Sequence, residues 1–83
     1  MIKKRFEVRA FKECPVTGES KEIESDFDSL KIAKECAKIA LTNGFAVLVN
    51  GWEDLLNGEG RVIESTRVSI YEPMGKGWEV IEL

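Results

Sequence analysis

The sequence predicts an α+β domain in which a mostly antiparallel sheet of four or five strands carries one helix on one face, in the order β-β-α-β-β-β. Five segments have the apolar patterns of strands, and most of them alternate apolar with polar side chains. A single segment has helical periodicity. Turn residues near both ends of the chain indicate hairpins, which join antiparallel strands.

The first two predicted strands, residues 4–12 and 22–27, form a hairpin. Apolar and charged side chains alternate in both, so each has one apolar face. Placing Phe6 opposite Phe27 aligns these faces and also brings unlike charges together on the other face, as Arg9 opposite Glu24. A slip of two residues would satisfy the same rule.

The helix is predicted to begin after Asp28, a good N-cap, and to end at Asn43 and Gly44. The middle of its apolar face is mostly alanine, which allows close approach to a sheet. Ile32 and Ile39 widen the apolar arc beyond the stripe that one layer needs to bury. We expect a loop or strand end of the same chain to cover them; the alternative is a contact with a second molecule.

Three further strands complete the prediction. Residues 45–49 are continuously apolar, as in a central strand covered on both faces. Gly51 indicates a bulge or the end of this strand, and residues 54–60 are predicted to form a loop. Residues 61–72 then form a long strand, and residues 78–83 form the last one, with Glu79 and Glu82 to discourage uncontrolled edge pairing.

Several kinds of chemistry are excluded by composition. The chain has no histidine, so histidine-dependent nucleophiles and metal sites are absent. It has neither of the glycine-rich motifs that bind phosphates. Asp54 and Glu59 fit no calcium-loop spacing, and we expect a solvated acidic loop. The sequence therefore predicts neither an enzyme nor a catalytic residue, a cofactor or a metal site.

The two cysteines and two tryptophans have structural interpretations. Cys14 and Cys36 form no C-x-x-C pair, and Thr17 stands where a zinc knuckle would need its second thiolate. Cys14 has few cations near it in sequence and is expected to be a passive turn residue, with Cys36 a small core residue. The tryptophans are expected to supply buried apolar area.

Length and charge indicate one soluble domain, residues 1–83, which we expect in the cytoplasm. The 83 residues have room for one core, and 43% are hydrophobic, which is ordinary for globular chains. No apolar run is long enough to span a membrane. The net charge of −3 does not favour nucleic acid as the partner.

One helix covers one face of a sheet, so the other face is the candidate binding surface. It is expected to combine arginine with aromatic and aliphatic side chains, a composition enriched in binding hot spots. The alternative interpretation is an ordinary solvated face. The candidate partner-binding residues are Arg5, Arg9, Phe11, Ile63, Arg67 and Tyr71.

The preferred hypothesis is a non-catalytic protein-binding module that acts as an inhibitor, adaptor or regulator of a macromolecular partner. In size and composition alone, the chain is similar to accessory proteins of phages and mobile elements, including anti-CRISPR inhibitors. The alternative is binding of single-stranded nucleic acid, with basic side chains on phosphates and Phe11 and Tyr71 stacked on bases. A homodimer through the open face or through Ile32 and Ile39 is a further alternative.

Overall fold

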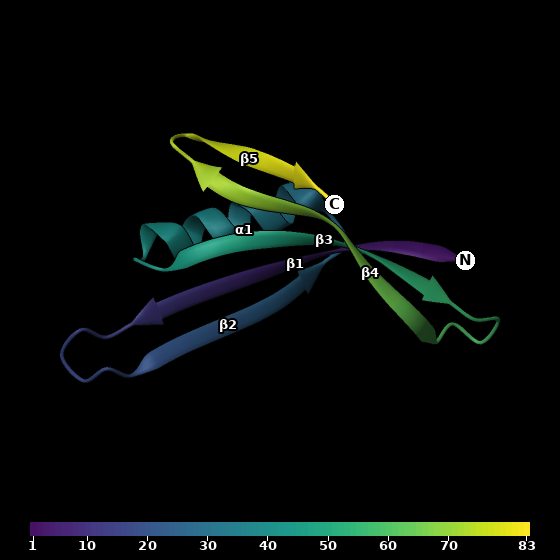
Figure 1. Cartoon of the computed structure of the whole chain (residues 1–83), viewed down its shortest axis with the longest axis horizontal. Helices are drawn as coiled ribbons and strands as arrows, with labels where there is room; N and C mark the ends of the chain where they lie inside the picture. Colours follow the sequence, from purple (N-terminus) through teal and green to yellow (C-terminus); the bar gives the residue numbers. More distant parts are fainter.

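The structure has one antiparallel sheet of five strands with one helix packed on it, so the predicted fold class and element order are confirmed (Figure 1). It is a computed structural model and describes all 83 residues. The elements are β1 (Ile2–Glu13), β2 (Ser20–Phe27), α1 (Leu30–Thr42), β3 (Ala46–Leu56), β4 (Val62–Met74) and β5 (Gly77–Glu82).

The strands lie in the order β2-β1-β3-β4-β5, so β3 is central and β2 and β5 are the edges. Every neighbouring pair is antiparallel. The first hairpin has the predicted register, with Phe6 opposite Phe27 and Arg9 opposite Glu24. Alternation excludes a shift of one residue, which would bury the other face, and the structure decides against the two-residue slip that alternation also allows.

The helix begins one residue later than predicted. Ser29, not Asp28, is the N-cap, and its hydroxyl accepts a hydrogen bond from the Ile32 amide at 3.4 Å. Both residue types cap well, so the backbone decides: Ser29 has the extended conformation of an N-cap, and Asp28 instead forms an ion pair with Lys3 at 3.6 Å. The end of the helix is as predicted, since Gly44 follows with a φ of 88°.

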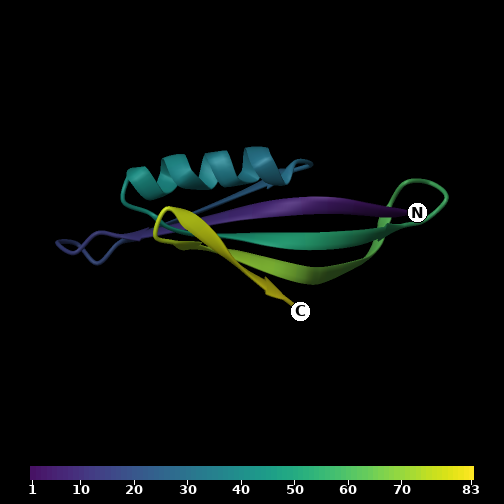
Figure 2. The same ribbon diagram turned by 90° about the horizontal axis from the view of Figure 1, so that it is seen from above.

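The core lies between α1 and the middle of the sheet. Ala33 and Ala37 are fully buried against Val8 of β1 and Val49 of β3. Their small side chains let the helix lie close along the strands, as Figure 2 shows. The helix contacts β1 and β3, and β2 to a lesser extent, but makes no close backbone contact with β4 or β5. One side of the sheet is therefore covered over three of its five strands.

The central strand is longer than predicted. It continues through Leu56, so the predicted loop over residues 54–60 is wrong for residues 54–56 and confirmed for residues 57–60. Pairing with the long first strand extends it, since Ile2 lies opposite Leu55. The remaining turn is organised by Asn57, whose side-chain oxygen accepts hydrogen bonds from the amides of Glu59 and Arg61.

The outer side of the helix is uncovered. Ile32 is 52% exposed and Ile39 is 66% exposed, so the expectation that the chain itself would cover them is wrong. Every other segment lies on the sheet side of α1 or beyond its ends (Figure 2). The helix is also too short and too charged to cross a membrane.

The close packing of α1 makes its stability sensitive to side-chain size. We expect Ala37→Leu to lower the free energy of unfolding by about 1–3 kcal/mol, because the larger side chain would push the helix away from Val8 and Val49. Ile39→Leu, at an exposed position of the same helix, should change it by less than about 0.5 kcal/mol. Urea unfolding measures both; equal effects would contradict the packing account.

Candidate functional site

The sheet side opposite α1 carries most of the predicted binding residues. Val8 packs against the helix, so its neighbours in β1 point to the other side. Arg5, Arg9 and Phe11 lie there as predicted, and Arg67 joins them because it is opposite Trp52, the cross-strand partner of Arg5. We call this side the helix-free face and define it by Arg5, Glu7, Arg9, Phe11, Asn50, Trp52, Asp54 and Arg67.

Two bulges in β4 change which of its residues belong to this face. Opposite β3, the register passes from Ser69 directly to Arg67, and later from Glu64 directly to Val62. Val68 and Ile63 are therefore extra residues without partners of their own, and each bulge interrupts the alternation of side chains. A prediction that assigns the residues of β4 to the two faces by strict alternation is therefore wrong at both bulges.

The placement of Tyr71 on the binding face is wrong for this reason. Tyr71 lies beyond the first bulge and packs against the core beneath the helix, with the Lys34 ammonium 5.1 Å from its ring centre. Ile63 is itself a bulge residue and has no partner on β3, so alternation does not fix its side of the sheet. Val62 takes the position opposite Leu56 and lines a hollow with Arg5 and Asp54.

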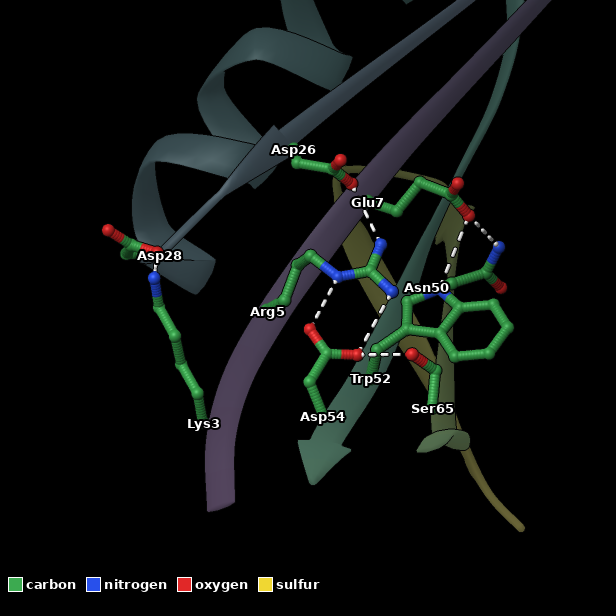
Figure 3. Close-up of polar contacts among 9 residues, drawn as sticks. All are labelled: Lys3, Arg5, Glu7, Asp26, Asp28, Asn50, Trp52, Asp54 and Ser65. Carbon is green, nitrogen blue, oxygen red and sulfur yellow. Dashed lines mark hydrogen bonds and ion pairs between the residues drawn. The ribbon is translucent and has the colours of Figure 1, made fainter. Parts of the chain in front are cut away.

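Arg5 is the centre of a polar network on the helix-free face (Figure 3). Its Nε donates to Asp54 Oδ2 at 2.9 Å and its Nη2 to Asp54 Oδ1 at 3.2 Å. Its Nη1 donates to Asp26 Oδ1 at 3.0 Å, and the hydroxyl of Ser65 donates to Asp54 Oδ1 at 2.6 Å. The guanidinium carbon lies 5.2 Å from the ring centre of Trp52. The network therefore joins β1 to β2, β3 and β4.

Asp54 is ionised and fixed within this network. Its side chain is only 7% exposed. The hydrogen bonds from Arg5 hold the pKa of Asp54 below its ordinary value of 3.8, with help from Ser65 and against the effect of burial. A bidentate guanidinium–carboxylate pair is among the stronger polar contacts in proteins, so Arg5 has a defined orientation here.

A second set of contacts surrounds Asn50 at the centre of the sheet. Asn50 is buried, and its Nδ2 donates to Glu7 Oε1 at 3.0 Å. The indole nitrogen of Trp52 donates to the same Glu7 oxygen at 3.3 Å (Figure 3). The side-chain oxygen of Asn50 has no hydrogen-bond partner. Glu7 thus links β1 to the central strand through two donors.

Arg9 is also held by carboxylates of its own chain. It forms ion pairs with Glu22 and with Glu24 on β2, the latter at 3.1 Å. The hydrogen bond to Glu22, followed by the charges of Glu22 and Glu24, raises the pKa of Arg9 above its ordinary value. Two of the three predicted arginines, Arg5 and Arg9, therefore have intramolecular carboxylate partners.

The apolar part of the face lies at its other end. Phe11 is 45% exposed, although it lies within a strand. It lines a hollow of about 210 Å³ whose other lining residues include Ala46, Val47 and Leu48, together with the charged Arg9 and Glu22. Protein–protein interfaces likewise combine aromatic and apolar side chains with charged and polar ones.

Cys14 lies in the turn between β1 and β2, away from this face. The turn is closed by hydrogen bonds between Cys14 and Glu19 and between Gly18 and Cys14. Hydrogen bonds from the side chain and backbone of Thr17, and from the amide of Val16, lower the pKa of the Cys14 thiol to about 7. Sequence reasoning looked for cations near this cysteine and overlooked hydrogen-bond donors, which also stabilise a thiolate.

Sequence reasoning placed Glu24 opposite Arg9 but overlooked the acidic partners of Arg5. Asp54 was assigned to a loop, although it lies two residues from Trp52 and two from Leu56, the spacing of side chains on one face of a strand. That spacing is the signal that could have placed it on the helix-free face. In the structure, no group of three or more cysteine or acidic side chains is arranged to hold a metal ion.

Comparison of the chain with protein-family models, with curated proteins and with solved structures finds no match. The function must therefore be argued from the site itself.

Removing the buried carboxylate should destabilise the fold. We expect Asp54→Asn to lower the free energy of unfolding at neutral pH by about 3 kcal/mol, because Arg5 would lose its charged bidentate partner. Glu24→Gln, which weakens the exposed pair with Arg9, is the matched control and should lower it by less than about 1 kcal/mol. Urea unfolding compares the two; an equal or larger loss in the control would contradict the role of Asp54.

The same pair should contribute to acid sensitivity. Because the pKa of Asp54 is lower in the folded state than in the unfolded state, its stabilisation is complete above the ordinary value of 3.8 and is lost as pH falls through the folded value. The stability difference between the wild type and Asp54→Asn should therefore shrink in acid. A difference that stays constant down to strongly acidic pH would contradict this.

The Cys14 thiol should react with alkylating agents at unusually low pH. In a Cys36→Ser background, we expect the rate of iodoacetamide modification to follow a titration with a midpoint near pH 7, below the ordinary value of 9.0. Thr17→Val should raise the midpoint because it removes the main hydrogen bond, whereas Thr17→Ser should retain it. A midpoint near 9 in all three proteins would show that the turn does not activate the thiol.

Proposed function

We propose that this protein is a non-catalytic protein-binding module whose helix-free face docks on another protein. The observation that carries the proposal is surplus surface, meaning accessible surface in excess of that of a compact monomer of the same mass. The chain has 5976 Å² of accessible surface, whereas a compact monomer of 9.4 kDa is expected to have about 5,000 Å². The difference, about 1,000 Å², is similar to the ~800 Å² that one partner contributes to a stable protein–protein interface.

The distribution of apolar side chains supports the same interpretation. Five hydrophobic residues are buried, all of them valine or alanine, while fourteen large hydrophobic side chains are exposed. The radius of gyration is 14.5 Å, compared with about 12 Å for a compact domain of this length. An elongated chain with a small core and many exposed apolar side chains is well suited to acquiring apolar cover from a partner.

The helix-free face is the surface we assign to this partner. It offers the exposed ring of Phe11 beside an apolar hollow and, further along, Trp52 and Arg67. Arg5 and Arg9 are already oriented by their carboxylate partners, so docking would lose little side-chain freedom at these positions. A partner would thus meet a largely pre-formed surface, as an inhibitor, adaptor or regulator requires.

The single-stranded nucleic acid hypothesis has less support. It needs basic side chains such as Arg5 and Arg9 for phosphates, and both Phe11 and Tyr71 for base stacking. The two arginines are paired with aspartate and glutamate, and Tyr71 lies on the helix side of the sheet beneath Lys34. Phosphate binding would have to displace carboxylates that carry the same sign of charge as the ligand.

The proposal is tested by affinity capture with the tagged chain from lysate of its source cells. We expect the tagged chain to capture one discrete protein, and nuclease treatment should not release it. Phe11→Asp and Arg67→Glu should each abolish the capture, whereas Val16→Asp should retain it. Val16 is 90% exposed and lies in the turn between β1 and β2. Val16→Asp therefore adds the same charge as Phe11→Asp, but outside the helix-free face.

The proposal fails if no protein is captured or if both face variants still capture it. Nuclease-sensitive capture that the variants weaken would favour nucleic acid instead. Circular dichroism of each variant verifies that it is folded before its binding is interpreted.

A further inference from the structure

The edge strand β5 has an unpaired backbone. It pairs with β4 on one side and has no strand on the other. The amide of Leu83 donates to the carbonyl of Val68 on β4, at 3.0 Å. Because backbone groups alternate in direction along an antiparallel strand, Glu79 and Ile81 also point their N–H and C=O groups toward β4. The corresponding groups of Trp78, Val80 and Glu82 therefore point outward.

The pairing partner of Trp78 is consistent with this alternation. Trp78 lies opposite Pro73, which has no N–H to donate. A proline fits there because residues at such a position do not hydrogen-bond across the pair. The outward edge of β5 thus offers three residues with free donors and acceptors.

The side chains of this edge are apolar on both faces of the sheet. Val80 is 49% exposed on the helix side, opposite Tyr71, and Ile81 is 36% exposed on the other side. Natural edge strands are usually protected by charged side chains, above all lysine, by proline or by a bulge. Residues 77–82 contain no lysine, proline or bulge, and their two charges, Glu79 and Glu82, would face Ile81 and Trp78 of a second copy in the pairing described next.

Antiparallel pairing of β5 with β5 of a second copy is self-complementary. A two-fold axis perpendicular to the sheet at Val80 would place Val80 opposite Val80 and Trp78 opposite Glu82 of the second copy. All three outward-pointing residues would then be hydrogen-bonded, and Glu79 would face Ile81 rather than another acid. The other edge lacks this property, because centring β2 at Ile23, Glu24 or Ser25 would place acidic side chains opposite each other.

Charge complementarity supports the same register. Lys34 extends from α1 over Trp78, with its ammonium 5.9 Å from the ring centre, and has no acidic partner in its own chain. Glu82 shares the helix side of the strand with Trp78 and also has no ion-pair partner. With Trp78 opposite Glu82 of the second copy, that carboxylate would lie beside Lys34.

From these observations we infer that the protein forms a homodimer through β5, with a continuous ten-stranded sheet and two symmetric ion pairs between Lys34 and Glu82 of the second copy. This inference uses a different surface from the helix-free face and does not depend on the proposed function.

Sedimentation velocity over a range of protein concentrations tests the dimer. We expect the wild type to be dimeric and Val80→Pro to be monomeric, because proline removes an N–H that points away from β4 and leaves the intramolecular pairing intact. Val80→Thr keeps the N–H and the branched shape, so it should remain dimeric. Circular dichroism verifies the fold of both.

Charge reversal tests the register. Lys34→Glu and Glu82→Lys should each raise the dimer dissociation constant, by roughly tenfold for the two symmetric pairs, and the double variant should restore it. Lys21→Glu, on the opposite edge strand, is the matched charge control and should have no effect.

A wild type that is monomeric at every concentration would overturn the inference. A dimer that persists in the Val80→Pro variant would also overturn it. If Phe11→Asp dissociates the dimer and Val80→Pro does not, the contact lies on the helix-free face. A dimer whose affinity does not respond to either single charge reversal would overturn the proposed register.

Discussion

One guanidinium group, that of Arg5, holds four strands together on the side of the sheet that has no helix. It donates to Asp26 on β2 and to Asp54 on β3, and Ser65 on β4 donates to the same Asp54 carboxylate. Ion pairs on a solvated surface usually contribute little, but Asp54 is buried, so the dielectric screening of this pair is weaker. The helix-free face is thus stabilised by polar cross-strand contacts, whereas the opposite face is stabilised by apolar packing.

The opposite face shows what a single short helix can cover. Alanines bring α1 close to β1 and β3, but a helix that lies so close to these strands does not reach β4 and β5. Lys34 partly spans this gap by extending over the rings of Tyr71 and Trp78. The exposure of Val80 on β5 follows from this incomplete cover.

The two proposed contacts are compatible with each other. A two-fold axis perpendicular to the sheet would leave both helix-free faces on the same side of the dimer. Two such faces would allow one dimer to bind a repetitive or dimeric partner twice, and a second binding event within the same complex is favoured by high effective concentration. The ion pairs that orient Arg5 and Arg9 would serve binding by reducing the entropy lost on docking.

The sequence by itself determined the element order, the faces that the first hairpin aligns and the presence of Arg5, Arg9, Phe11 and Arg67 on one face, because these follow from local alternation of apolar and polar residues. Only the tertiary structure decided three other features. The bulges in β4 turned Tyr71 toward the helix, and pairing with β1 extended β3 to include Asp54. No other segment folds over the outer side of α1, so Ile32 and Ile39 are uncovered. Each depends on the contacts between two secondary-structure elements, and the alternation of residues within one segment does not specify those contacts.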